Sequence, residues 1–183
     1  MSYYDDIYES AVDNYYLITT REARRIGVPP VELAKLAKRG KLQHISHGVY
    51  RLSRHVPHPN DPYAVSVARV GEDAYLYGES VIAMLGLAPT NPARIYVATP
   101  KRYRGKGADG LVVVQRPDAG DATAYEGVPS QEAGAAIVSC LGKTMPSRLR
   151  AAAEAARDEG YLTRGAYENV LEEIGAYEAA EHP

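Results

Sequence analysis

Residues 17–52 read LITTREARRIGVPPVELAKLAKRGKLQHISHGVYRL, and this stretch decides the fold of the N-terminal part of the chain. Thr19 and Glu22 are three residues apart, which is the spacing of a capping box at a helix N-terminus. We therefore expect a short helix over residues 20–26. Gly27 follows it, and glycine readily takes the left-handed conformation that ends a helix.

A second helix is expected directly after a stiff turn. Pro29 and Pro30 fix their φ angles and keep the preceding residues from continuing the first helix. Pro30 also suits the first turn of a helix over residues 31–39, which Gly40 closes. Two short helices joined by a tight turn that contains glycine are typical of the helix-turn-helix motif.

A basic β-hairpin is expected next. Residues 41–45 and 49–52 alternate apolar and polar side chains, and Gly48 supports a turn between them. Upstream, apolar side chains four residues apart predict a helix from about Tyr4 to Tyr15. Helix, helix, basic helix and basic hairpin in this order predict a winged helix-turn-helix.

The formal net charge of −2 conceals an uneven distribution. Residues 17–56 carry nine Lys or Arg and two Glu, a net charge of +7, whereas residues 1–16 carry −4 and residues 57–183 carry −5. A basic block within an acidic chain indicates an anionic partner, and the alternative is a merely solvated basic face.

The basic residues are distributed over every element of the predicted winged helix. A recognition helix lies in the major groove, where its outward side chains meet base edges and phosphates, and the wing crosses the backbone beside it. We therefore expect DNA contacts from the second helix (Lys35, Lys38, Arg39), from the first (Thr20, Arg21, Arg24, Arg25) and from the wing (Lys41, His44, His47, Arg51).

The histidines of this region have two other interpretations. His44 and His47 are equally compatible with ordinary surface residues. A metal site built from His44, His47, His55 and His58 would have no acidic or cysteine ligand near it, so no metal site is expected.

The rest of the chain predicts a second domain. Three prolines in residues 57–62 indicate a stiff linker, so we expect a DNA-binding domain over 1–56, a linker over 57–61 and an α+β domain over 62–183. The fold class is thus α+β, a winged helix-turn-helix followed by a small sheet and a helical C-terminus. The expected helices are 62–70, 79–85, 131–141, 146–159 and 163–178, and the expected strands are 74–77, 94–99 and 111–115.

No catalytic constellation emerges, so neither an enzyme nor a cofactor is expected. Ser80 follows a glycine but lacks the second glycine of a nucleophile elbow, and Cys140 lies among the apolar residues of a predicted helix. The loop over 101–107 lacks the spacing of a phosphate-binding loop. Its four cations, Lys101, Arg102, Arg104 and Lys106, suit a flexible loop, a second DNA contact, or a toxin or RNA contact.

The composition predicts a cytoplasmic protein without a membrane partner. One cysteine cannot form an internal disulfide, and no apolar run approaches the roughly 18 residues that a membrane helix needs. The 15 Tyr, without any Phe or Trp, mean that every core aromatic side chain carries a hydroxyl group.

Residues 17–52 resemble the N-terminal domain of the AbiEi family, the antitoxins of abortive-infection type IV toxin–antitoxin systems. The similarity lies in the T-x-x-x-A-x-x-x-G start, the helix ending in Lys-Arg-Gly and the His-Gly-Val-Tyr-Arg of the wing, and it continues over residues 74–104. One departure is Ser130-Gln131-Glu132-Ala133, where many relatives have a Thr-x-x-Arg helix start.

The resemblance implies a DNA-binding repressor of its own operon, with operator repeats in the promoter, that counteracts a nucleotidyltransferase toxin in phage defence. The net charge of −6 over residues 151–183 then suits either a solvated helical face or a surface for a basic partner. The alternatives are a winged-helix transcription factor with a ligand-sensing second domain and no toxin, and an RNA-binding or enzymatic second domain.

Overall fold

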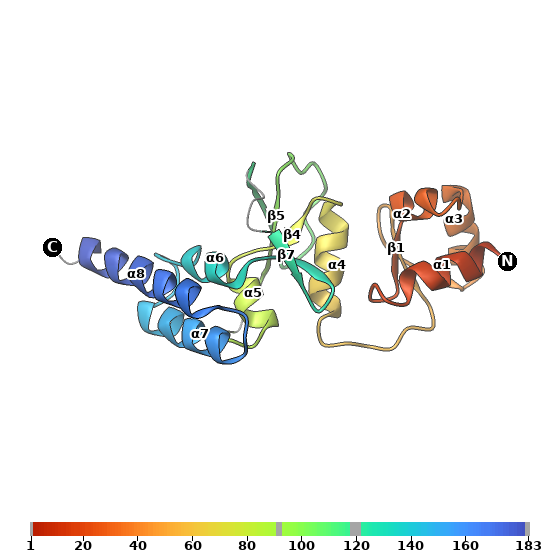
Figure 1. Ribbon diagram of the computed structural model, residues 1–183. Coiled ribbons are helices and arrows are strands. Elements are labelled where there is room, and N and C mark those ends of the chain that lie inside the picture. Colours follow the sequence, from red (N-terminus) through yellow and green to blue (C-terminus); the bar gives the residue numbers. More distant parts are fainter. Residues whose placement is uncertain (1, 91–92, 118–121, 182–183) are drawn as a thin grey trace. The chain divides into compact units, whose positions relative to one another are not determined.

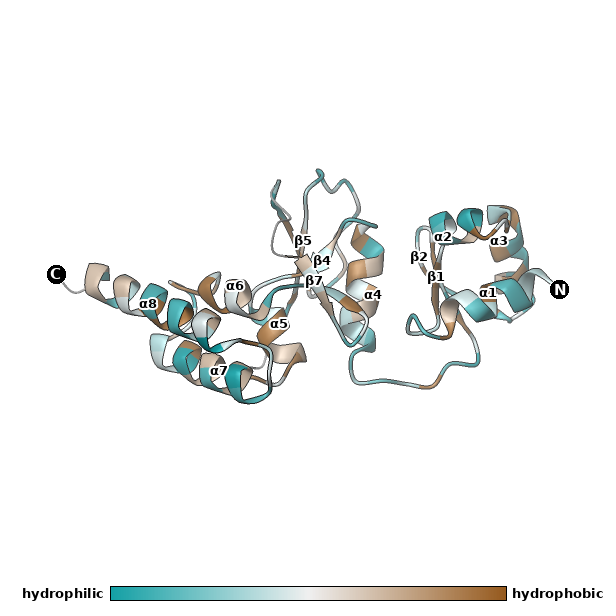
Figure 2. Ribbon diagram, in the orientation of Figure 1, coloured by the Kyte–Doolittle hydropathy of each residue, from teal (hydrophilic) through white to brown (hydrophobic). Residues whose placement is uncertain are grey.

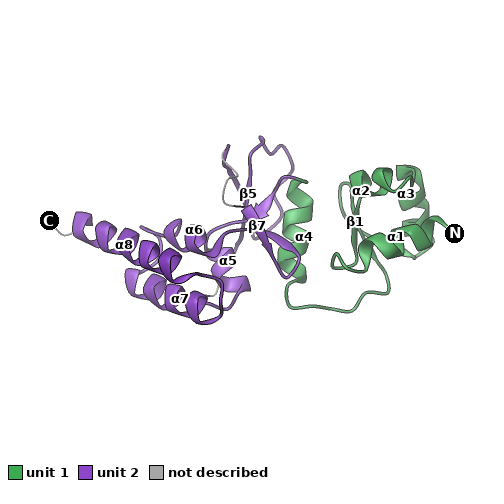
Figure 3. Ribbon diagram, in the orientation of Figure 1, with its two compact units in different colours: residues 1–72 green, residues 73–183 purple. Residues whose placement is uncertain are grey.

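The computed structural model describes residues 2–90, 93–117 and 122–181 (Figure 1). The chain forms two compact units, residues 1–72 and 73–183 (Figure 3). This division groups the helix over Asp61–Val70 with the first unit, whereas the sequence groups it with the second. The expected boundary at residues 57–61 stays a prediction.

The first unit is a winged helix-turn-helix followed by one further helix, as the sequence predicts. A three-stranded antiparallel sheet has the strand order β1-β3-β2. Its elements are α1 (Tyr3–Ala11), β1 (Leu17–Thr19), α2 (Thr20–Arg25), α3 (Pro30–Lys38), β2 (Leu42–Ser46), β3 (Val49–Leu52) and α4 (Asp61–Val70).

Local sequence signals set the two helices of the motif. The Glu22 backbone N–H donates to Thr19 Oγ1 at 3.2 Å, and Glu22 Oε2 accepts from the Thr19 backbone N–H at 2.8 Å, which completes the capping box. Pro29 precedes α3 with φ −63° and ψ 138°, and Pro30 is the first helical residue. Gly27 ends α2 with φ +80°.

The core of the first unit lies between the helices and the sheet. Apolar side chains from α1, β1, α2, α3 and both strands of the wing pack together, and in Figure 2 the apolar strand β1 contrasts with the hydrophilic helix α2. Because each helix buries one apolar stripe, the charged residues of α2 and α3 lie on their outer faces. The buried residues are Ile7, Ala11, Ile18, Ala23, Val28, Leu33, Leu36, Leu42 and Leu52.

The first helix is shorter than expected. The sequence predicts a helix to Tyr15, but α1 ends at Ala11, and both Tyr15 and Tyr16 have positive φ angles. Asn14 stabilises the turn, because its backbone N–H donates to Ala11 O at 2.9 Å and its carbonyl accepts from Leu17 N. After this turn the chain continues as β1, a strand that the sequence does not predict.

The second unit is α+β, which confirms the expected fold class. Its five-stranded mixed sheet has the order β6-β5-β4-β8-β7, in which β6 lies parallel to β5 and β4 lies parallel to β8. Its elements are β4 (Tyr75–Leu76), α5 (Glu79–Met84), β5 (Ile95–Thr99), β6 (Leu111–Gln115), β7 (Ala122–Tyr125), β8 (Val128–Gln131), α6 (Ala133–Val138), α7 (Pro146–Asp158) and α8 (Arg164–Glu181).

A hairpin replaces the start of the helix expected over 131–141. Strands β7 and β8 pair around Glu126 and Gly127, which have φ angles of +50° and +76° and so form a tight turn. Gln131 ends β8, and α6 begins only at Ala133. The side chain of Gln131 is buried, with Oε1 accepting from the Gly78 backbone N–H at 3.0 Å.

The three C-terminal helices pack against one another (Figure 1). Small residues let α7 approach its neighbours closely, since Ala152, Ala153 and Ala156 are fully buried beside Leu149 and Ile174. Among the described residues, no helix has the length and apolarity required to cross a membrane.

Candidate nucleic-acid interface

Helix α3 has one buried and one outward face. Leu33 and Leu36 are buried in the core, as the sequence predicts, while Ala34, Lys38 and Arg39 are exposed. Neither Lys38 nor Arg39 forms an ion pair with a described residue. Their charges are therefore available to an anion outside the chain.

Lys35 lies on the same face but has a partner within the helix. Its Nζ is 2.7 Å from Glu32 Oε1, and 53% of its side chain is exposed. An exposed pair of this kind contributes little stability, so a phosphate can replace Glu32 at small cost.

The cations of α2 divide into two kinds. Arg24 is exposed and forms no ion pair with a described residue, whereas Arg21 and Arg25 both pair with Glu72. Glu72 lies just after α4, about fifty residues away in the sequence. Sequence reasoning missed this carboxylate, since no local spacing connects it to α2.

The wing turn is anchored to the helix-turn-helix by Thr20. The Thr20 backbone N–H donates to Gly48 O at 2.8 Å, and Thr20 Oγ1 lies 3.4 Å from the same oxygen. Exposed His47 sits in this turn. The ring of His44, on β2, lies 5.1 Å from that of Tyr50 on the paired strand.

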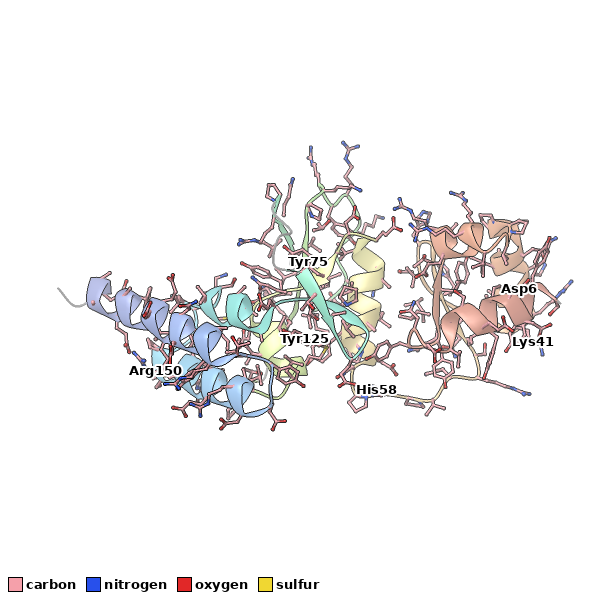
Figure 4. All side chains as sticks on the ribbon, in the orientation of Figure 1. Asp6, Lys41, His58, Tyr75, Tyr125 and Arg150 are labelled. Atoms are coloured by element: carbon pink, nitrogen blue, oxygen red, sulfur yellow. The ribbon has the colours of Figure 1, made fainter. Side chains whose placement is uncertain are left out.

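Two residues assigned to the wing lie away from its turn. Arg51 is half-buried on β3, the central strand of the sheet, where it pairs in register with Leu17 and Gln43. Lys41 lies beside α1, with Nζ 5.7 Å from the centroid of the Tyr4 ring (Figure 4). The turn itself therefore presents His47 and not these two cations.

The histidines after the wing contact tyrosines. The His55 ring lies 6.3 Å from the Tyr16 ring, and the His58 ring lies 5.4 Å from the Tyr15 ring. His58 Nδ1 also accepts from the Asn60 backbone N–H at 3.1 Å. Within the described ranges, no group of three or more His, Cys, Asp or Glu is arranged to hold a metal ion.

The basic loop of the second unit connects β5 to β6. Lys101 pairs with Asp73, while Arg102, Arg104 and Lys106 are exposed and form no ion pair with the residues that the structure describes. After the loop, the Arg116 guanidinium lies 5.3 Å over the Tyr77 ring and donates to its hydroxyl at 3.0 Å. Three unpaired cations thus remain for a partner.

Ser80 and Cys140 of the second unit are both buried. Ser80 is fully buried, and its Oγ accepts from the Tyr96 backbone N–H at 2.7 Å. Burial raises the pKa of the Cys140 thiol to about 12. A protonated, buried thiol is a poor nucleophile.

Comparisons with known proteins bear on the first unit. Residues 5–53 match the family model described as "Transcriptional regulator, AbiEi antitoxin", which confirms the resemblance for this region. No curated protein matches the chain. Among solved structures, the crystal structure of the RV2827C protein from Mycobacterium tuberculosis is similar, with a TM-score of 0.46 and 16% identity over 91% of this chain and 79% of that one.

Proposed function

We propose that this chain is an AbiEi-type antitoxin and transcriptional autorepressor. Its first unit binds operator repeats in the promoter of its own toxin–antitoxin operon, and its second unit counteracts a nucleotidyltransferase toxin. The observation that carries the proposal is that the residues matching the antitoxin regulators form a winged helix-turn-helix with a cationic outer face on α3.

The outer face of the motif has the chemistry of a DNA contact. Lys35, Lys38 and Arg39 on α3 and Arg24 on α2 are exposed. A helix of this kind enters the major groove, where such side chains reach phosphates and the acceptor edge of guanine. Because cations that neutralise phosphates release counterions, affinity falls steeply as salt rises.

Operator binding is tested with DNA from the chain's own promoter. The Lys35→Ala/Lys38→Ala variant is expected to bind at least about tenfold more weakly at 0.15 M salt, with the slope of log Kd against log salt reduced by about two. The matched control is Lys143→Ala/Arg148→Ala, which removes the same charge from exposed positions of the second unit. Equal affinity of the two double variants would exclude α3 as the recognition helix.

Two features of the second unit support a role toward a partner protein. The last helix exposes Glu168, Glu172, Glu173 and Glu181, which suit a basic, nucleic-acid-handling partner. The loop between β5 and β6 exposes Arg102, Arg104 and Lys106, which suit a phosphate-bearing one. These features support the proposal that this unit counteracts the toxin, by direct contact or by opposition to the toxin's effect.

Antitoxin activity is tested by growth during co-expression with the neighbouring nucleotidyltransferase gene, with both genes under unrelated promoters. Wild type and Lys35→Ala/Lys38→Ala are both expected to restore growth, because this assay does not need operator binding. If wild type fails to restore growth, the antitoxin assignment is wrong. Absence of such a gene would instead favour a winged-helix transcription factor with a ligand-sensing second unit.

A further inference from the structure

Two exposed apolar side chains flank the turn of the helix-turn-helix. Val31, the second residue of α3, is 56% exposed, and Ile26, the C-cap residue of α2, is 38% exposed. The neighbouring apolar residues Val28, Leu33 and Leu36 are buried in the core of this unit. Val31 is not among the residues of this core, and more than half of its surface is accessible to a partner.

The exposed apolar residues of α3 and its lysines lie on the same face of the helix. Val31, Ala34, Lys35 and Lys38 follow at the i, i+3, i+4 and i+7 positions of one helix face, and Ala34 and Lys38 are exposed like Val31. The outer face of α3 thus changes from apolar at its N-terminal end to cationic at its C-terminal end. The lysines of this face suit a polyanionic partner. A partner that also covers the N-terminal end of α3 would bury Val31 best if it offers an apolar group there.

DNA offers one such group on its major-groove edges, the C5-methyl group of thymine. The N-terminal residues of a recognition helix are the ones that contact base edges. Neither Val31 nor Ala34 has a side-chain hydrogen-bond donor or acceptor, so neither can read guanine, adenine or cytosine by hydrogen bonding.

We propose that Val31, with Ala34 one turn later, binds thymine C5-methyl groups in the major groove of the operator. Lys35 and Lys38 contact the neighbouring phosphates or a guanine edge. Each half-site therefore carries a T·A pair opposite the start of α3. The inference rests on the proposed operator binding and adds to it the base that is recognised.

The turn before α3 holds Val31 in place for this contact. Pro29 and Pro30 have fixed φ angles, and the Gly27 backbone N–H donates to Arg24 O at 3.1 Å. The backbone that carries Val31 therefore has little conformational freedom.

The test compares promoter DNA with the same duplex in which deoxyuridine replaces thymidine, a change that removes only the methyl groups. The full-length chain is expected to bind the uracil duplex about fourfold more weakly for each methyl group that Val31 and Ala34 bury. Val31→Ala is expected to weaken binding to thymine DNA by a similar factor and to leave binding to uracil DNA unchanged. Single thymine-to-uracil replacements then locate the base.

Val56→Ala is the matched control, because Val56 is 67% exposed in the segment after the wing and outside the proposed contact. It is expected to bind both duplexes like wild type. The inference is overturned if Val31→Ala loses the same factor on both duplexes, or if wild type binds the two equally. Absence of any preference for promoter over unrelated DNA would instead refute operator binding itself.

Discussion

The backbone N–H of Thr20 donates to the carbonyl oxygen of Gly48 at 2.8 Å, which joins the first residue of α2 to the wing turn. The two residues are 28 positions apart, and a Cβ atom at residue 48 would lie 3.3 Å from Thr20 Oγ1. Gly48 also has a φ angle of +70°. The wing is therefore held against the helix-turn-helix at a position that favours glycine.

Gly48→Ala is expected to lower the free energy of unfolding of the first unit by about 1–2 kcal/mol, the cost of a left-handed conformation for a residue with a Cβ atom. Urea denaturation measures the change. Gly175→Ala is the control, because Gly175 lies within α8 with open space around it and alanine stabilises a helix interior. A Gly48→Ala variant as stable as wild type would show that the wing turn can change its conformation freely.

Glu72→Gln is expected to strengthen DNA binding. The carboxylate of Glu72 pairs with both Arg21 and Arg25, so its removal frees two cations of α2 for phosphates. Each of the two exposed ion pairs contributes ~0.2–1 kcal/mol, so losing both predicts a roughly two- to thirtyfold lower Kd on promoter DNA. The salt dependence is expected to become steeper as well.

The control for this variant is Glu9→Gln, an exposed carboxylate of α1 that forms no ion pair with a described residue. It changes the net charge equally. If both variants bind DNA with the same increased affinity, the effect comes from overall charge and not from release of the arginines.

Gln131→Leu is expected to destabilise the second unit by about 1–3 kcal/mol. The substitution leaves the Gly78 backbone N–H without the acceptor that Gln131 Oε1 provides, in a buried position. It also removes the hydrogen bond that Nε2 donates to Ser139 Oγ at 2.9 Å. Gln115→Leu, at an exposed position of β6, is expected to leave the urea midpoint nearly unchanged.

Cys140 predicts a specific pH dependence of stability. Burial raises the pKa of its thiol from an ordinary value near 9 to about 12, so between these pH values the unfolded chain loses the thiol proton while the folded chain keeps it. Stability is therefore expected to fall as pH rises above 9. Urea midpoints at pH 8 and pH 10 should separate more in wild type than in Cys140→Ala, and equal separations would contradict the assignment.

Local signals predicted the helix-turn-helix well. The capping box of Thr19 and Glu22 and the prolines before α3 act within a few residues, so their effect can be read directly from the sequence. The same holds for the basic outer face of α3. The match of residues 5–53 to antitoxin regulators agrees with that prediction.

The features that sequence reasoning missed depend on distant partners or unusual backbone. Strand β1 has three residues and exists because β3 pairs with it from thirty positions away. Tyr15 and Tyr16 take positive φ angles that tyrosine rarely adopts, so α1 ends earlier than its apolar spacing predicts. The Glu72 contact likewise depends on a tertiary arrangement and not on spacing.

Pro29 and Pro30 have a kinetic consequence for the proposed binding to operator DNA. The chain fixes these two residues when it folds, so the entropy of shaping the start of α3 is already lost before DNA arrives. Binding to DNA then requires no further folding of the start of α3. The association rate should follow diffusion and electrostatic steering, and differences between good and poor operators should appear mainly in how long the complex lasts.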